Sequence, residues 1–116
     1  MTSLVGHLIN GKIVTDADKT QDVFNPSSGE VSKQVALANR ATVNEAIAAA
    51  EKAFVSWRNT PAMKRARVMF KFKDLLEQHS TKICDLIGQE HGKIAHDAVG
   101  ELQRGIENVE YACCAP

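Results

Sequence analysis

The sequence predicts an α/β chain in which residues 1–40 form short strands and turns and residues 42–115 form three or four amphipathic helices. Two observations predict this order. Near the start, Asn-Gly lies between two short apolar runs, a pattern typical of a β-hairpin. From Thr42 onward, apolar residues recur at three- and four-residue intervals, which is the helical period. The chain has 116 residues, 44% of them hydrophobic and 24% charged, as in an ordinary globular domain.

The first third of the chain alternates between short apolar runs and turn residues. We expect residues 7–9 and 12–14 to pair as a hairpin around Asn10-Gly11, because both turn positions favour positive φ. Residues 15–20 are polar and predict a loop. Val23-Phe24 leads into the turn cluster of residues 25–29, and residues 31–38 predict a half-buried strand. Its buried side is expected to carry Val31, Val35 and Leu37.

A helix is predicted from Thr42 to Arg58. Thr42 and Glu45 fit a capping box, in which the Thr hydroxyl accepts from the first turn and the Glu side chain reaches back. The apolar stripe of this helix comprises Val43, Ile47, Ala50, Phe54 and Trp57.

Helical spacing resumes after Thr60, with Pro61 expected at the first helical position, and continues to about His91. Because this stretch is long for one helix, we expect residues 79–81 to divide it, with Ser80 or Thr81 capping the second half. Gly92 then favours a helix end, and Lys93 suits a carboxyl terminus. The apolar stripe here comprises Met69, Phe72, Leu76, Ile83 and Leu86.

The last predicted helix runs from Ile94 to Cys114, and Pro116 is expected to end it. Its buried stripe is expected to comprise Ala95, Val99, Leu102, Ile106, Val109 and Cys113. A different face is expected to carry Gly100, Arg104, Glu107 and Tyr111.

Several kinds of site are disfavoured by the sequence. The 14 basic and 14 acidic residues give no net charge, so no overall field favours nucleic acid or a membrane surface. Neither of the glycine-rich nucleotide-binding motifs GxGxxG and GxxxxGK[ST] is present.

The cysteines and the absence of a targeting segment indicate the compartment. Three cysteines without zinc spacing suit a reducing compartment, and no signal peptide or apolar span is evident, so we expect a cytoplasmic protein. The cysteines are Cys84, Cys113 and Cys114; the histidines, expected at the surface or at caps, are His7, His79, His91 and His96.

Arg104 is the candidate binding residue. It lies in mid-helix, off the apolar stripe and one turn from Gly100, where a missing side chain permits close approach. A guanidinium there could bind a carboxylate through two hydrogen bonds. The local sequence favours the alternative that Arg104 pairs across a helical turn with Glu101, Glu107 or Asn108.

Three stretches together resemble the aldehyde dehydrogenase superfamily. HLINGKIV followed by VFNPSSGEV is similar to its opening, and ATVNEAIAAAEKAFVSWRNTPAMKRARVMFKFKDLLEQH to its first two helices. In GQEHGKIAHDAVGELQRGIENVEYACCAP, residues 90–93 replace the usual EtGK-like motif. This last stretch resembles the CoA-dependent methylmalonate-semialdehyde dehydrogenase branch, and the resemblance covers essentially the whole chain.

The resemblance implies an α/β aldehyde dehydrogenase fold and a reaction. Enzymes of this branch oxidise malonate or methylmalonate semialdehyde with NAD through a catalytic cysteine. The thioester loses carbon dioxide and is transferred to CoA, giving acetyl-CoA or propionyl-CoA in valine and inositol breakdown. Family members are homo-oligomers, usually tetramers. The Arg of RGIENVEY is thought to bind the substrate carboxylate, and here that residue is Arg104.

Family members are several times longer than this sequence. The resemblance therefore implies that residues 1–116 are the amino-terminal part of the nucleotide-binding domain, without the catalytic domain. On this reading the chain alone is inactive and binds neither NAD nor CoA, and its helices lie against a sheet encoded downstream. One alternative is a stand-alone helical interaction or regulatory domain. Another is a fragment of a different aldehyde dehydrogenase branch.

Overall fold

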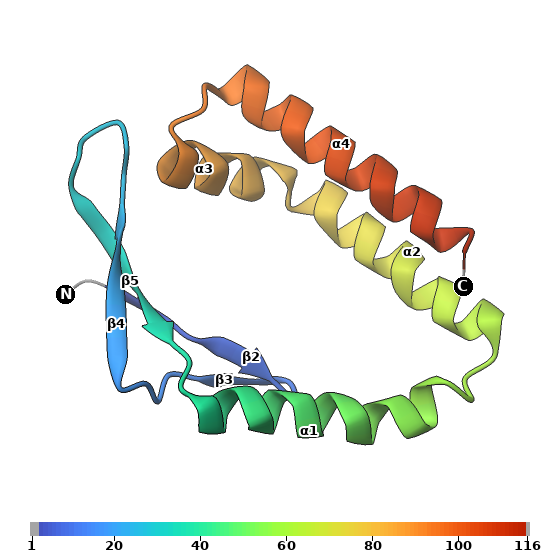
Figure 1. The fold of residues 1–116 in the computed structure, drawn as a ribbon. Helices are drawn as coiled ribbons and strands as arrows, with labels where there is room; N and C mark the ends of the chain where they lie inside the picture. The colour runs from blue at the N-terminus through green and yellow to red at the C-terminus, as the bar shows by residue number, and fades with distance from the viewer. Residues whose placement is uncertain (1–2, 116) are drawn as a thin grey trace. The chain divides into compact units, whose positions relative to one another are not determined.

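The computed structural model describes residues 3–115, which form five β-strands followed by four α-helices (Figure 1). This order of short strands followed by helices confirms the fold class predicted from the sequence. The chain divides into two compact units, Met1–Asn59 and Thr60–Pro116. The expected end of the last helix at Pro116 lies outside the described residues.

The first unit contains two small sheets. β1 (Ser3–Val5) pairs in parallel with β5 (Val31–Leu37), and β4 (Lys19–Phe24) pairs antiparallel with the other edge of β5. β2 (His7–Ile9) and β3 (Lys12–Val14) form the predicted hairpin, with positive φ at both Asn10 and Gly11. Gly6 joins the two sheets, and a β-carbon there would lie only 2.6 Å from the carbonyl oxygen of Val14.

Two strands differ from the sequence-based expectation. β1 was not predicted, and β4 begins at Lys19 although residues 15–20 were expected to be a loop. Lys19, Thr20 and Gln21 are exposed and lack apolar alternation, so their strand conformation comes from pairing with β5 rather than from burial. A polar edge strand of this kind does not show the alternation of apolar and polar residues from which strands are predicted.

β5 has the predicted position but not the predicted buried side. Ala36 is 2% exposed, whereas Val31 and Leu37 are 41% and 40% exposed. A bulge also interrupts the ladder, since Val23 pairs with Lys33 and Phe24 pairs with Val31, leaving Ser32 as the extra residue. Alternation identifies the two faces of a strand but not which face is covered, and here the side of Ala36 is covered.

α1 (Arg40–Trp57) begins two residues before the predicted Thr42. The cap is Asn39, whose side-chain Oδ1 accepts from the backbone N–H of Thr42 at 2.9 Å and from its hydroxyl at 3.0 Å. The predicted capping box is therefore wrong, because Thr42 already lies inside the helix and is buried. The apolar stripe of α1 is largely exposed, including Ile47 and Phe54.

The second unit consists of α2 (Ala62–Gln78), α3 (Ser80–His91) and α4 (Ala95–Cys113). The predicted break falls at His79, but neither Ser80 nor Thr81 is the cap, since His79 joins α2 to α3 without a side-chain cap bond. Pro61 precedes the first helical residue instead of occupying it. Gly92 ends α3 as predicted, in the left-handed region with φ of 79°.

α4 packs against both α2 and α3 (Figure 1). The buried residues of this three-helix unit are small or branched: Ala66, Ala98, Ile106 and Cys113. Of the predicted α4 stripe, Ile106 and Cys113 are buried, whereas Ala95 and Val99 are exposed. Ala95 and Val99 line a groove beside α3 that leaves them exposed, whereas Ala98 is buried. Within residues 3–115 no helix combines the length and apolar character needed to cross a membrane.

Candidate functional site

Arg104 lies near the middle of α4 and is exposed. The buried residues Ala98, Ile106 and Cys113 are spaced eight and seven residues apart, so they share the face of α4 that packs on α2 and α3. Helical periodicity places Arg104 on the opposite face of α4. Packing within the unit therefore presents the guanidinium away from its own core.

The outward face of α4 leaves space for the guanidinium. A β-carbon at Gly100, one turn before Arg104, would lie 3.9 Å from Nη1 of Arg104. Tyr111, on the same face, is 80% exposed. Gly100 and Tyr111 therefore share the predicted face with Arg104, and no bulky side chain separates Gly100 from the guanidinium.

The carboxylates expected to pair with Arg104 do not do so. Glu101 is bound instead by the ammonium group of Lys93, which lies in the turn between α3 and α4. Asn108 donates from its side-chain amide to the backbone carbonyl oxygen of Arg104 at 2.8 Å, so its contact is with the Arg104 backbone. Within the described part of the chain, no carboxylate forms an ion pair with the Arg104 side chain.

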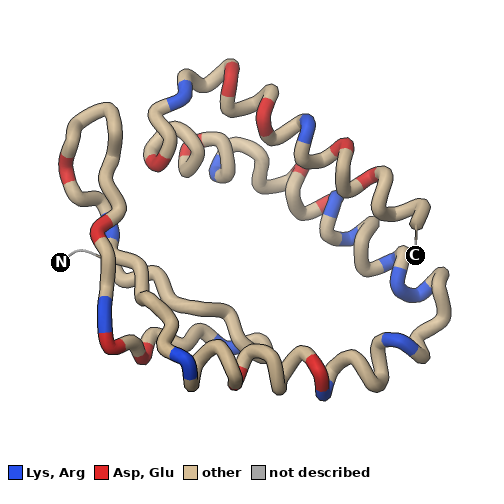
Figure 2. The backbone as a smooth tube through the Cα atoms, viewed as in Figure 1, with Lys and Arg blue, Asp and Glu red and all other residues tan. Residues whose placement is uncertain are grey.

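α4 is mainly acidic: it carries Asp97, Glu101, Glu107 and Glu110, and Arg104 is the one Lys or Arg within its span (Figure 2). The Lys93 ammonium, which donates to the Glu101 carboxylate, lowers the pKa of Glu101 from its ordinary value, and the charges of His91 and Arg104 add to this effect. On the packed side, Lys73 of α2 pairs with Glu77 at 2.9 Å and with Glu110 of α4 at 3.1 Å. These two carboxylates raise the pKa of Lys73.

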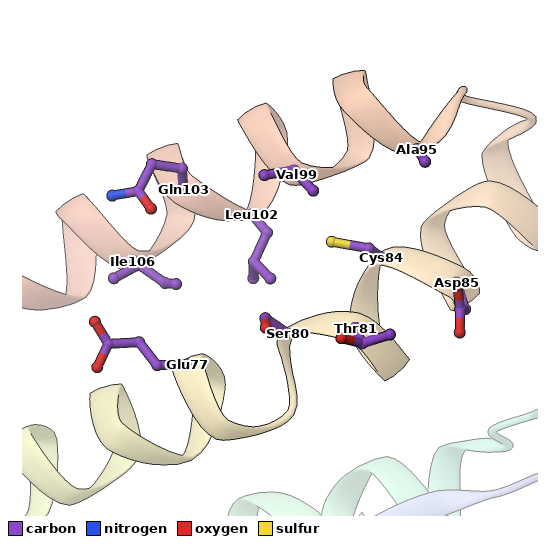
Figure 3. A pocket seen from close by; sticks show the side chains of 10 residues that line it. All are labelled: Glu77, Ser80, Thr81, Cys84, Asp85, Ala95, Val99, Leu102, Gln103 and Ile106. Atoms are coloured by element: carbon purple, nitrogen blue, oxygen red, sulfur yellow. The ribbon is translucent and has the colours of Figure 1, made fainter.

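A groove of about 400 Å³ separates α4 from the junction of α2 and α3 (Figure 3). Cys84 points from α3 toward α4 across this groove, and Leu102 points toward it from α4. Cys84 is half-buried, Cys113 is buried in the helix packing and Cys114 is exposed; all three are free thiols. Cys84 lines this groove and is therefore only partly buried.

Known proteins identify the family. The sequence profile of the aldehyde dehydrogenase family matches residues 13–116. This chain belongs to the aldehyde dehydrogenase family. The resemblance inferred from the sequence is thereby confirmed.

Similar proteins point to one branch of the aldehyde dehydrogenases. A malonate-semialdehyde dehydrogenase of Pseudomonas aeruginosa is 58% identical over 110 residues, which are 95% of this chain and 22% of the relative. The crystal structure of a methylmalonate-semialdehyde dehydrogenase from Oceanimonas doudoroffii superposes with a TM-score of 0.95 at 67% identity. The superposition covers 100% of this chain and 24% of the Oceanimonas chain.

A third comparison comes from a structure with a bound cofactor. A candidate methylmalonate-semialdehyde dehydrogenase from Sinorhizobium meliloti, solved in complex with NAD, has a TM-score of 0.93 at 37% identity. The superposition covers 97% of this chain and 23% of the Sinorhizobium chain. The present chain thus spans about a quarter of the length of the relatives it matches, and its fold is that of the corresponding part of an aldehyde dehydrogenase.

The sequence pattern gives no link between Lys93 and Arg104. From the sequence, Lys93 is only a basic residue near a helix end. Glu101 was considered only as a helical neighbour of Arg104. The eight residues between Lys93 and Glu101 cross the left-handed turn at Gly92, so no helical spacing rule relates them. The short interval between Gly92 and the start of α4 could have indicated this contact, because it keeps Lys93 close to the first turns of that helix.

Proposed function

We propose that this chain is the amino-terminal part of the nucleotide-binding domain of an NAD-dependent, CoA-acylating malonate- or methylmalonate-semialdehyde dehydrogenase. The complete enzyme would oxidise the semialdehyde and release carbon dioxide, giving acetyl-CoA or propionyl-CoA. The names of the Pseudomonas and Oceanimonas relatives support the substrate class. The NAD complex of the Sinorhizobium protein supports the nucleotide. We further propose a cytoplasmic homo-oligomer, as the resemblance implies.

Within this chain, we assign Arg104 as the residue that binds the substrate carboxylate. The observation that carries the assignment is that its guanidinium is exposed on α4 without an ion pair among the described residues, although Glu101 and Glu107 are in helical range. A guanidinium presents planar donors that match the two oxygens of a carboxylate. Malonate and methylmalonate semialdehydes carry such a carboxylate at the end away from the aldehyde.

We propose that residues 3–115 make no contact with NAD. The positive-φ glycines Gly11, Gly29 and Gly92 lie singly at separate turns, and no glycine-rich loop leads from a strand into a helix in the described residues. We therefore assign no cofactor contact to these residues. Arg104 would act on the substrate alone, by fixing the carboxylate so that the aldehyde end is held in one orientation.

The test uses the complete enzyme that contains this chain. Arg104→Leu should lower kcat/KM for malonate semialdehyde by about 10- to 100-fold, the range expected when a charge-assisted hydrogen bond worth about 1.5–3 kcal/mol is lost. Arg104→Lys should recover part of this loss, since it keeps the charge but not the planar pair of donors. Propanal, which lacks the carboxylate, is the matched substrate, and its kcat/KM should change little.

Two results would contradict the proposal. Equal losses for malonate semialdehyde and propanal would show that Arg104 supports the structure and not the carboxylate. Formation of a free acid in place of a CoA thioester, with the rate independent of CoA, would place the enzyme in another aldehyde dehydrogenase branch.

A further inference from the structure

The ion pair between Lys93 and Glu101 lies beside the residue assigned to substrate binding. Glu101 precedes Arg104 by three residues on α4, a spacing at which a carboxylate and a guanidinium normally attract each other. In this structure the Glu101 carboxylate is bound by Lys93 instead. Among the described residues the Arg104 guanidinium has no ion pair.

We propose that Lys93 is a positioning residue that holds Glu101 in an ion pair and so keeps Arg104 free for the substrate carboxylate. This inference rests on the proposed function of Arg104. Without Lys93, Glu101 would be free to compete for the guanidinium from one helical turn away. A carboxylate substrate would then have to displace Glu101 before it could bind, which raises the apparent KM.

The turn between α3 and α4 fixes the position from which Lys93 acts. Gly92 adopts the left-handed conformation that ends α3, and its N–H donates to the carbonyl of Gly88 at 2.9 Å. The carbonyl oxygen of Lys93 lies so close to α3 that a β-carbon at Gly88 would be 3.4 Å from it. The backbone of Lys93 is therefore held against α3, and its side chain reaches Glu101 on α4.

Lys93, and not Arg104, is the hydrogen-bonded partner of Glu101. The side chains of Lys93 and Glu101 are 27% and 43% exposed, so water competes only in part for their ion pair. Among the influences that lower the pKa of Glu101, the hydrogen bond from Lys93 is the largest and the charge of Arg104 is the smallest. His91 also lowers the pKa of Glu101.

The alternative is that Lys93 and Glu101 only tie the turn to α4. The two explanations differ in the double variant. If the pair is only a structural tie, Lys93→Met/Glu101→Gln should be as impaired as Lys93→Met. If Lys93 restrains a competitor of the substrate, replacing Glu101 with a neutral side chain removes that competitor and makes Lys93 unnecessary.

The experiment measures KM and kcat of the complete enzyme for malonate semialdehyde and for propanal. Lys93→Met should raise KM for malonate semialdehyde about two- to fivefold, the range set by one partly exposed ion pair. KM for propanal and kcat for both substrates should stay near the unmodified values. Lys93→Met/Glu101→Gln should restore KM for malonate semialdehyde, and Lys93→Arg should preserve it.

Lys73→Met is the matched control, because it removes another lysine that bridges to a glutamate of α4, on the side away from Arg104. It should not change the ratio of the two KM values. If Lys93→Met does not fold, Lys93→Gln keeps a polar side chain and replaces it in the series. An unchanged KM in the single variant, or a double variant as impaired as the single one, would overturn the inference.

The same series separates failure of this inference from failure of the proposed function. If Arg104→Leu raises KM for malonate semialdehyde but Lys93→Met does not, Arg104 binds the carboxylate and the role of Lys93 is wrong. If Arg104→Leu leaves KM unchanged, the assignment of Arg104 itself fails, and the inference about Lys93 fails with it.

Discussion

The Glu101 side chain offers a direct measure of its ion pair. The hydrogen bond from Lys93 lowers the pKa of Glu101 below 4.5, its ordinary value. A group whose pKa is lower in the folded state stabilises the fold at pH values above its unfolded pKa. That contribution is lost as the pH falls through the lowered value. We therefore expect the pair between the turn and α4 to persist at pH 4.5 and to break only in more acidic solution.

This expectation gives a titration experiment on the 116-residue chain, with trimethylamine N-oxide added to favour the compact state. Carbon-13 NMR of the Glu101 carboxyl should give a midpoint below 4.5, and Lys93→Met should move the midpoint upward. Lys73→Met should leave it unchanged, because Lys73 pairs with Glu77 and Glu110 instead. A midpoint that does not respond to Lys93→Met would show that the ion pair does not form in solution.

Arg104 also shows what the local sequence cannot decide. Helical spacing alone offers Glu101, Glu107 and Asn108 as partners and favours pairing. The structure removes Glu101 from this set through Lys93, a contact that depends on the turn at Gly92. Competition between partners from different segments is a tertiary property. The local pattern therefore singled out Arg104 but favoured a helical pair, and only the family resemblance favoured a substrate role.

Asn39 determines where α1 begins, and its removal is predicted to loosen the first turn. Its side chain accepts from both the backbone N–H and the hydroxyl of Thr42. Replacing a cap of this kind with Ala typically costs about 1 kcal/mol. We expect Asn39→Ala to speed hydrogen exchange at the Thr42 amide about fivefold, measured by NMR under the same osmolyte conditions.

Asn44→Ala is the control for Asn39→Ala, because Asn44 is an exposed residue inside α1. Ala is the better helix former at that position, so exchange at Thr42 should stay the same or become slower. If Asn39→Ala and Asn44→Ala have the same effect, the cap contributes nothing in solution, and Thr42 with Glu45 would again be candidates for the start of α1.

The predictability of each element follows from how local its determinants are. The β2–β3 hairpin and the end of α3 were correctly predicted, because Asn10, Gly11 and Gly92 each need a backbone conformation that few residues adopt. The predicted start of α1 was wrong because Asn39 and Thr42 are both good caps. Only the backbone conformation decides which of them caps the helix. β1 and β4 were missed because they are short or polar and are formed by pairing with the distant β5.

Taken as a whole, the chain has much apolar surface and little core. The buried hydrophobic residues are few and mostly small, and among residues 3–115 no large side chain is fully buried. Large apolar residues remain exposed in both units, among them Ile47 and Phe54 in the first and Met63 and Val99 in the second. Exposed apolar area on this scale is typical of surfaces that other parts of a protein cover.

We therefore predict that the isolated 116-residue chain is weakly stable. Burial of apolar area is the main favourable contribution to folding, and small domains are already marginal, so such a sparse core leaves little net stability. Urea unfolding followed by circular dichroism should give a broad transition at low urea concentration, and a dye that binds apolar surface should fluoresce strongly before urea is added. The complete enzyme, measured in parallel, should unfold at higher urea and bind less dye per chain. A sharp transition at high urea and weak dye binding by the isolated chain would instead mean that residues 1–116 close their own core, which would favour a stand-alone helical domain over part of a larger dehydrogenase.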